Sequence, residues 1–236
     1  MTTAKHTPEL RVVDRSVVAN RPGYQAELVS DAAKRCGAEV EYQIAPWQRA
    51  LLLVKNGDAD GAFSSSYDEE RAAYAVYPMA DGKPDFTRAL KGYSYSLYVH
   101  RDGGPTWDGN VITAANRTVA VERGSSAIPR ITELDLSPVE NADNATMLRM
   151  VAGKRVGAAA IITSFADAIL AEAPDLAATV VKREPPIESK FGYVMLSKPF
   201  YARHKGVAEC FWTMIRDIRA TPQYVELVRS YLAEGP

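Results

Sequence analysis

The stretch from Pro46 to Arg71 decides the fold, because it passes through a helix, a tight turn, a buried strand and a second helix start. It reads Pro46-Trp47-Gln48-Arg49-Ala50-Leu51, then Asn56-Gly57-Asp58-Ala59-Asp60-Gly61-Ala62-Phe63-Ser64-Ser65-Ser66-Tyr67-Asp68-Glu69-Glu70-Arg71. Residues 47–55 have helical spacing, and residues 60–63 form a short apolar run after the Gly-Asp turn. The order brings hydroxyls, backbone N–H groups and a guanidinium to one strand end, an arrangement that suits a small carboxylate.

Helix and strand patterns alternate on both sides of this stretch. Strands are expected at residues 11–13, 40–44, 93–99, 118–121, 156–162, 180–181 and 191–196. Helices are expected at residues 25–36, 144–152 and 164–171, with two more helical segments near the C-terminus. Strands that alternate with helices predict a sheet of parallel strands with helices on its faces.

Composition limits the possible classes of function. The chain has 236 residues, 47% of them hydrophobic and 24% charged, with a net charge of −1, which indicates an ordinary globular protein of one domain or two modest lobes. The interspersed charges argue against nucleic acid as the main partner. No apolar run approaches the roughly 18–20 residues that span a bilayer. Residues 1–10 lack the apolar core of a secretory signal, so the chain is either cytoplasmic or without its signal.

Cysteines and histidines predict no metal centre and no nucleophilic enzyme. Cys36 and Cys210 have no metal-ligand spacing. Two buried free thiols are the favoured interpretation, and a disulfide stays open because it requires Cα atoms within about 7 Å. His6, His100 and His204 lie outside any Gly-x-Ser-x-Gly motif and converge on no ligand set, so no metal and no cofactor are expected.

The chain resembles the polar-amino-acid-type solute-binding proteins, family 3, which have the periplasmic-binding-protein-like II fold. The resemblance covers about residues 10–233 and is carried by residues 46–51, 56–61, 68–71 and 119–126 and by the ending from 191 to 231. It implies an α/β fold of two lobes, each with a mixed, mostly parallel sheet flanked by helices. Lobe 1 would comprise residues 1–99 and 192–236, and lobe 2 residues 100–191, joined by two hinge strands.

The resemblance implies that the stretch from Pro46 to Arg71 binds the anionic end of a ligand. Arg71 would grip a carboxylate with two parallel hydrogen bonds, a geometry that lysine does not supply. Ser64 and Ser66 share a face of a regular strand and would contact the same group. The alternative for Arg71 is a surface arginine paired with Asp68 or Glu69, and for the serines ordinary turn or helix-cap chemistry.

Further candidates complete the predicted ligand site. Gly124, Ser125 and Ser126 repeat the order of strand, glycine turn and helix start in the other lobe, and the resemblance implies that they meet the same carboxylate. Their alternative is a plain strand-to-helix turn. Trp47 either stacks against the ligand or belongs to the core. Arg49 either lies in the cleft or is a solvated residue on its helix. Tyr24 is a weaker candidate for the mouth of the cleft.

One departure from the family concerns the ligand's ammonium group. Amino-acid binders of this type carry an aspartate after the strand that corresponds to residues 156–162, whereas here Thr163 and Ser164 follow and Asp167 is the first acid. A buried ammonium without a carboxylate partner costs several kcal/mol, about the penalty for desolvating one ion. The ligand is therefore not expected to be a standard L-α-amino acid, and Thr163 or Ser164 would bond a neutral or hydroxylated group.

These features predict a periplasmic, monomeric solute-binding protein that closes on a small carboxylate-bearing metabolite and delivers it to the membrane subunits of an ABC importer. The periplasmic location follows from the resemblance, with the signal peptide absent from this chain. Two alternatives remain open. One is the ligand-sensing domain of a receptor. The other is a dehydratase-like enzyme, with Glu69, Glu70 or Asp167 as its acid.

Overall fold

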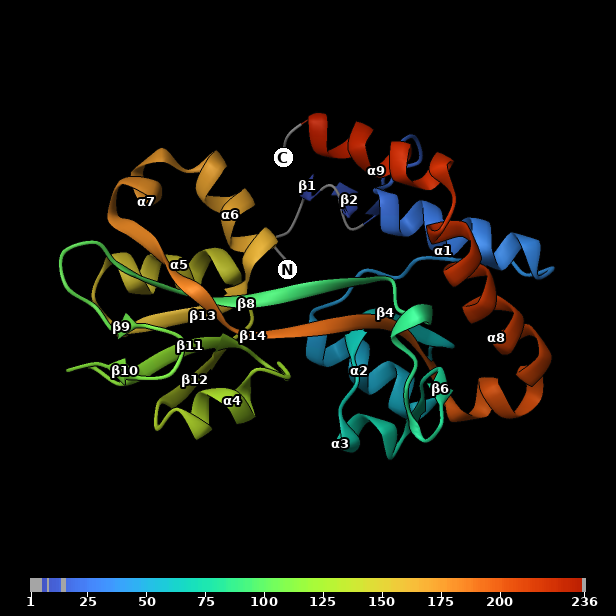
Figure 1. Ribbon diagram of the computed structural model, residues 1–236, viewed down its shortest axis with the longest axis horizontal. Helices are drawn as coiled ribbons and strands as arrows, with labels where there is room; N and C mark the ends of the chain where they lie inside the picture. Colours follow the sequence, from blue (N-terminus) through green and yellow to red (C-terminus); the bar gives the residue numbers. More distant parts are fainter. Residues whose placement is uncertain (1–5, 8, 14–15, 235–236) are drawn as a thin grey trace. The chain divides into compact units, whose positions relative to one another are not determined.

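The computed structural model describes residues 6–7, 9–13 and 16–234, and these form two compact units. The middle unit is Tyr93–Lys190. The terminal unit combines the described residues up to 92 with residues 191–234. The chain passes between the units inside two long strands, β8 (Lys91–His100) and β14 (Val180–Ser197) (Figure 1).

The terminal unit is built from both ends of the chain. Its helices are α1 (Tyr24–Arg35), α2 (Trp47–Asn56), α3 (Glu69–Ala72), the 3-10 helix η1 (Phe86–Arg88), α8 (Lys198–Arg219) and α9 (Pro222–Ala233). Its strands are β1 (His6–Thr7), β2 (Leu10–Val13), β3 (Ser16–Val17), β4 (Gly61–Ser66), β5 (Ala75–Val76), β6 (Met79–Ala80) and β7 (Lys83–Pro84). The end of β14 pairs antiparallel with β4 and β5, and β1, β2 and β3 form a small antiparallel sheet.

Alternate residues of β14 create two cores in the terminal unit. Val194 and Leu196 pack with α1, α8 and α9, whereas Tyr193 and Met195 pack with Val54 of α2. Side chains on a strand alternate between its faces, so this order covers β14 on both sides. Figure 1 shows α1, α8 and α9 on one side of these strands and α2 and α3 on the other.

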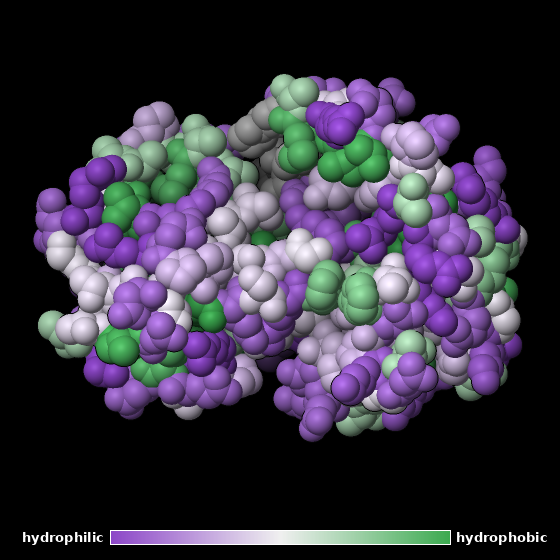
Figure 2. Space-filling view, in the orientation of Figure 1, coloured by the Kyte–Doolittle hydropathy of each residue, from purple (hydrophilic) through white to green (hydrophobic). Residues whose placement is uncertain are grey.

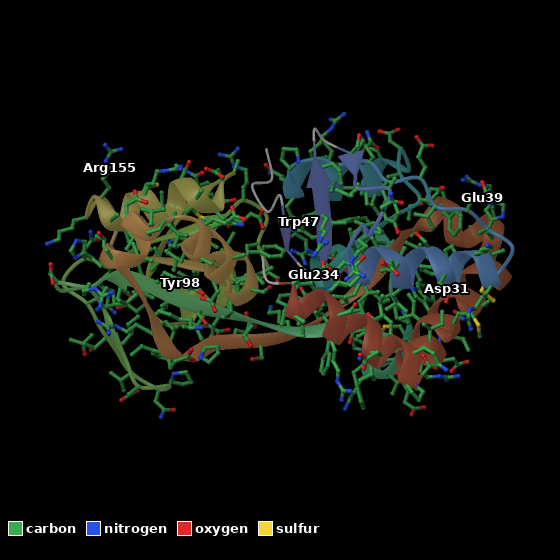
Figure 3. All side chains as sticks on the ribbon, turned by 90° about the horizontal axis from the view of Figure 1, so that it is seen from above. Asp31, Glu39, Trp47, Tyr98, Arg155 and Glu234 are labelled. Carbon is green, nitrogen blue, oxygen red and sulfur yellow. A yellow bond between two sulfur atoms is a disulfide. The ribbon has the colours of Figure 1, made fainter. Side chains whose placement is uncertain are left out.

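A disulfide joins Cys36, directly after α1, to Cys210 in α8, with Cα atoms 5.9 Å apart (Figure 3). The preference for two free thiols is therefore wrong. The two helices pack against each other, which brings together cysteines that are 174 residues apart in sequence. No local pattern encodes such a long-range approach.

In the middle unit the strands follow the order β12-β11-β13-β8-β14, which is part of a seven-stranded sheet that also includes β4 and β5. The strands of the middle unit are β9 (Thr106–Trp107), β10 (Ile112–Thr113), β11 (Thr118–Glu122), β12 (Ser137–Asn141), β13 (Ala158–Ile162) and parts of β8 and β14. β9 and β10 form a separate two-stranded sheet. The helices of the unit are α4 (Ile128–Glu133), α5 (Asn144–Ala152), α6 (Thr163–Glu172) and α7 (Pro174–Thr179). β11 is parallel to β12 and β13, and β13 is antiparallel to β8, so the sheet is mixed.

The two faces of this sheet carry separate cores. Leu97 and Val99 of β8 pack with Ile131 of α4, and Tyr98 between them packs with Met147 of α5. Figure 1 shows α4 on one face of the sheet and α5, α6 and α7 on the other. Because both faces are covered, the inner strands are apolar in succession, as in Val119, Ala120 and Val121.

Two element predictions need correction, although the α/β fold class is confirmed. Residues 38–46 form no strand. Instead, the Tyr42 hydroxyl donates to the Ala26 carbonyl of α1 over 2.7 Å, and its ring lies edge-on to Phe63, so Tyr42 packs without strand pairing, whereas Val40 is 36% exposed. The predicted strands at 180–181 and 191–196 are one strand, β14, which continues through Pro185 and Pro186.

The surface of each unit is largely hydrophilic in the view of Figure 2, with apolar residues in small groups. Phe86 and Val111 are the most exposed large apolar side chains among the described residues, each 62% exposed. Within the described part of the chain, no helix has both the length and the apolar character that crossing a membrane requires.

Candidate functional site

The clearest functional cluster lies where β4 ends and α3 begins. Asp68 caps α3, because its carboxylate accepts the backbone N–H groups of Glu70 at 2.8 Å and Arg71 at 3.4 Å. This turn directs Arg71 back toward β4, where its Nη1 donates to the Ser66 carbonyl at 3.1 Å and to the Ser66 hydroxyl at 2.9 Å. Arg71 is 6% exposed. It is a buried arginine, and the surface-arginine alternative does not hold.

Trp47 joins the same cluster from α2. The Arg71 guanidinium carbon lies 5.6 Å from the centroid of the Trp47 ring, within the range of a cation–π contact. Trp47 is the first residue of α2 and is partly exposed, whereas Arg49, two residues later, is exposed. The structure thus brings together Trp47, Ser66 and Arg71, three of the residues predicted from the sequence.

The three serines at the end of β4 bond to three different elements. The Ser64 hydroxyl donates to the Gln25 side chain of α1, Ser65 bonds to the Tyr77 hydroxyl at 2.8 Å, and Ser66 accepts from Arg71. Ser64 has a φ of 62°, and the pairing of β4 with β14 shifts register beside it. The regular alternation behind the expected shared face of Ser64 and Ser66 is interrupted here by a β-bulge.

Tyr77 belongs to this cluster but carries no sequence signal. Its hydroxyl donates to the Ser66 carbonyl at 3.0 Å, so Tyr77 and Arg71 share one acceptor. The side chain is buried, and burial raises the pKa of Tyr77 well above its ordinary value. Tyr77 lies 11 residues beyond Ser66, outside any motif that joins the two.

Tyr24 lies in the helical core of the terminal unit. It is 7% exposed, and its ring meets Tyr224 and Tyr231 of α9 edge-on. Lys91 donates to the Tyr24 hydroxyl at 3.3 Å, and burial raises the pKa of Tyr24. These contacts connect α1 to α9 and β8.

In the middle unit, the Gly124–Ser126 turn follows β11 and is held by side chains of its own unit. Gly124 has a φ of +74°, in the left-handed region that favours glycine, and its N–H donates to the Glu140 carboxylate at 3.2 Å. The Ser125 hydroxyl donates to the Tyr95 hydroxyl at 3.3 Å. Ser125 is buried, so this hydroxyl helps to fix the turn on β8.

Ser126 is also buried, and its carbonyl accepts from Lys190 of β14 at 2.8 Å. Lys190 forms an ion pair with Glu188 at 3.0 Å. The turn therefore lies beside a lysine whose charge is balanced within the middle unit, a contact that the sequence did not reveal.

A second polar cluster fixes the start of α6 to β8. Thr163 donates its hydroxyl proton to the Ser94 carbonyl at 3.0 Å, and its oxygen lies 2.8 Å from the Ser96 hydroxyl. The Tyr98 hydroxyl oxygen lies 3.2 Å from the Thr163 carbonyl oxygen. Among the described residues, the Ser164 hydroxyl oxygen is buried and has no hydrogen-bond partner.

Asp167, one turn into α6, is engaged by two neighbours. The Tyr98 hydroxyl donates to one carboxylate oxygen at 2.7 Å, and Lys182 of β14 donates to the other at 2.8 Å. The hydrogen bond to Asp167 raises the pKa of Lys182, and burial raises that of Tyr98. Figure 3 labels Tyr98 on β8. The first acid after β13 is thus already paired with a cation of its own unit, and the same Lys182 lies 3.6 Å from Glu184.

Comparison with known proteins gives matches in structure only. No family model matches the chain, and no curated protein matches its sequence. The substrate-binding protein of an amino acid ABC transporter is similar, with a TM-score of 0.73 at 15% identity over 98% of this chain and 96% of that one. The fold is that of periplasmic binding proteins.

Two further solved structures have a similar fold. A mutant of ArgBP from T. maritima has a TM-score of 0.73 at 16% identity over 98% of this chain and 92% of its own. A histidine kinase sensor domain with similarity to periplasmic binding proteins has a TM-score of 0.73 at 18% identity, over 96% of this chain and 98% of its own. At these identities the likeness shows the fold alone.

No group of three or more histidine, cysteine or acidic side chains in the described part of the chain is arranged to hold a metal ion. The polar groups that the structure brings together in the terminal unit are a buried guanidinium and serine and tyrosine hydroxyls. These groups suit the binding of an anion by hydrogen bonds.

Proposed function

We propose that this protein is an extracytoplasmic solute-binding protein that captures a small carboxylate-bearing metabolite for an ABC importer. The observation that carries the proposal is the buried Arg71, whose Nη1 is held by Ser66 and whose guanidinium lies over Trp47. Capture includes closure of the two units about the long strands β8 and β14, as in the family that the chain resembles.

Arg71 is suited to a carboxylate for three reasons. Its guanidinium is charged at every physiological pH and presents a planar fork of N–H donors. The hydrogen bonds from Nη1 to Ser66 fix one edge of that fork before the ligand arrives, which lowers the entropy cost of binding. The 6% exposure of the side chain means that little water screens the charge.

The other end of the ligand is proposed to be neutral. In the middle unit both carboxylate oxygens of Asp167 are already bonded, one to Lys182 and the other to Tyr98, so Asp167 is not held ready for an ammonium group. The buried Ser164 hydroxyl would instead bond a neutral or hydroxylated group. We therefore propose a carboxylate that is not a standard L-α-amino acid.

The disulfide supports the extracytoplasmic location. Cys36 and Cys210 are bonded, and such bonds persist mainly in oxidising compartments. The membrane subunits of an importer would be the protein partner, with the solute-binding protein acting as a monomer.

A receptor's ligand-sensing domain is a second candidate, favoured by the similarity to a histidine kinase sensor domain. Reconstitution separates the two roles. An importer partner predicts solute-dependent ATP hydrolysis when the purified protein is added to its transporter in proteoliposomes. A sensor predicts instead that the solute changes kinase activity when the domain is joined to its own kinase.

A thermal-shift screen tests the binding proposal directly. The wild-type protein is heated with L-amino acids, hydroxy acids, dicarboxylates and aromatic acids, each next to its uncharged amide. A ligand that binds only the folded state raises the melting temperature. We expect hits among the acids, no shift with their amides, and no L-α-amino acid among the strong hits.

Arg71→Ala and Arg71→Lys are the matched variants. We expect Arg71→Ala to abolish the shift and Arg71→Lys to restore only part of it, since lysine keeps the charge but not the fork. Hits that bind Arg71→Ala with unchanged affinity would show that the carboxylate site is not at Arg71. Tight binding of ordinary L-amino acids would contradict the proposed neutral end.

A further inference from the structure

We propose that Tyr77 is the positioning residue of the Arg71 site: its hydroxyl fixes the Ser66 carbonyl, and that carbonyl fixes the orientation of the Arg71 guanidinium over Trp47. The inference rests on the proposed carboxylate site at Arg71. It deepens that proposal by naming a residue that acts on the site without contacting the ligand.

Ser66 is the point at which the two side chains meet. Its carbonyl oxygen accepts from the Tyr77 hydroxyl at 3.0 Å and from Arg71 Nη1 at 3.1 Å. The two donors approach from different elements, Arg71 from α3 and Tyr77 from the segment just after β5. A carbonyl oxygen has two lone pairs, so it accepts both bonds at once.

The direction of the Tyr77 proton follows from its neighbours. The hydroxyl lies near three acceptors, which are the Ser66 carbonyl, the Ser65 hydroxyl at 2.8 Å and the Met195 sulfur at 3.3 Å. It has one proton, and a carbonyl is a far better acceptor than a thioether. With the proton on the Ser66 carbonyl, Ser65 donates to the Tyr77 oxygen at 2.8 Å in preference to the Ser66 carbonyl, which lies 3.4 Å from the Ser65 hydroxyl. The result is a directed chain from Ser65 through Tyr77 to Ser66.

Packing holds Tyr77 in the position that this chain requires. The side chain is 3% exposed, and its ring meets Tyr67 edge-on at 5.4 Å and Tyr193 edge-on at 6.0 Å between centroids. A ring confined on these sides cannot swing away, so the hydroxyl remains against Ser66. The burial that raises the pKa of Tyr77 also keeps the hydroxyl protonated as a donor.

Ser66 connects the Tyr77 hydroxyl to Arg71, so a change at Tyr77 affects the position of Arg71. Arg71 Nη1 bonds to both oxygens of Ser66, so a rotation of the Ser66 peptide moves one edge of the guanidinium. The guanidinium carbon of Arg71 lies over the Trp47 ring, 5.6 Å from its centroid. Removing the Tyr77 hydroxyl leaves the carbonyl with one side-chain donor fewer and lets the peptide rotate, which changes the position of Arg71 over the indole ring.

Fluorine NMR of the full chain tests this without any ligand. The protein is labelled with 5-fluorotryptophan, and the Trp47 signal is assigned with Trp47→Phe. We expect Tyr77→Phe to move the Trp47 resonance and to leave those of Trp107 and Trp212 in place. Arg71→Lys, which removes the guanidinium from above the ring, calibrates the full size of the shift.

Tyr193→Phe is the matched control, because Tyr193 belongs to the same aromatic group and pairs with Ser65, yet its hydroxyl does not bond to Ser66. A merely structural role for Tyr77 predicts equal shifts in Tyr77→Phe and Tyr193→Phe, and either that result or an unmoved Trp47 resonance in Tyr77→Phe overturns the inference.

Ser65→Ala keeps the test decisive if Tyr77→Phe fails to fold. Loss of the Ser65 hydroxyl leaves the Tyr77 proton on the Ser66 carbonyl but removes the hydrogen bond that Ser65 donates to the Tyr77 oxygen, which weakens Tyr77 as a donor, so we expect a smaller Trp47 shift of the same sign. An unmoved Trp47 resonance in folded Ser65→Ala would overturn the inference. Because no ligand is present, these outcomes are independent of whether Arg71 binds a carboxylate.

Discussion

At the scale of single residues, the candidate site depends on one helix cap. Asp68 accepts the backbone N–H groups of Glu70 and Arg71, and this starts α3 in the direction that returns Arg71 to Ser66. α3 spans only Glu69–Ala72, too short to be stable by its own hydrogen bonds. The position of the guanidinium is therefore set by a carboxylate three residues earlier.

Asp68→Ala should lower both stability and ligand affinity. Loss of an N-cap side chain costs about 1 kcal/mol, and here the loss also loosens Arg71. Urea unfolding measures the first effect and titration with a hit of the acid screen measures the second. Asp68→Asn is the control, because asparagine caps helices about as well as aspartate. Equal loss of affinity in both variants would show that the charge of Asp68, rather than its cap, supports the site.

The sequence predicted the parts of the site that are close together in the chain. Arg71 and Ser66 lie five residues apart, and a strand end followed by a helix start is enough to place them together. The partners of the neighbouring serines were not predictable, since Gln25 lies 39 residues before Ser64 and Tyr77 lies 12 residues after Ser65. The bulge at Ser64 also has no glycine to signal it.

At the scale of elements, Tyr42 contacts α1 from a segment that was predicted to be a strand and is not one. The alternating residues 40, 42 and 44 predicted a strand, but the Tyr42 hydroxyl bonds to the Ala26 carbonyl and lies 2.9 Å from the Ser30 hydroxyl, both on α1. The alternating pattern includes Tyr42, which packs against α1 and Phe63, but also Val40, which is 36% exposed. Such a pattern does not show whether the backbone finds a strand to pair with.

The free energy of unfolding should fall in alkali, in part because Tyr42 loses its proton there. Burial raises the pKa of Tyr42 to about 12, above its ordinary value of 10.0. The unfolded chain therefore loses this proton first as the pH rises. The contribution of Tyr42 is complete below about pH 10 and disappears between about pH 10 and 12. Urea unfolding across this range measures it, and the fall should be shallower in Tyr42→Phe. An identical fall in both proteins would contradict the assignment.

The disulfide should contribute strongly to stability, because it closes a loop of 174 residues. Replacing both cysteines, as Cys36→Ser with Cys210→Ser, should cost about 2–4 kcal/mol, mainly by freeing the unfolded chain. Guanidinium unfolding measures the loss, and the wild-type protein in a reductant should match the double variant. Two titratable thiols in the native, unreduced protein would show that the bond does not form.

At the scale of the whole molecule, one unit is built from both ends of the chain and the other from its middle. The sequence placed the lobe boundaries at 99/100 and 191/192, and the two compact units meet in the chain at 92/93 and 190/191. The difference in the first boundary lies within β8, which is continuous from Lys91 to His100. An unbroken strand gives no local signal of where one unit ends, because its pattern is the same in both.

Strand direction was the least predictable feature. Alternating helices and strands predicted parallel pairs, and the middle unit has them between β11 and its two neighbours. In the terminal unit, β4 and β5 both pair antiparallel with β14. The strand that pairs with them comes from a distant part of the chain, and no pattern in residues 46–76 anticipates its direction.

Ligand binding should change the overall dimensions of the protein if the units close about β8 and β14. A ligand shifts such an equilibrium only by its greater affinity for one state, so closure requires that the bound carboxylate be held by both units. Small-angle scattering of the wild-type protein, with and without a saturating acid from the screen, should show a smaller radius of gyration in the bound state. Arg71→Ala at the same acid concentration should show the unbound value. A wild-type radius that does not change at saturation would mean that the terminal unit binds the acid alone and that hinge closure is no part of capture.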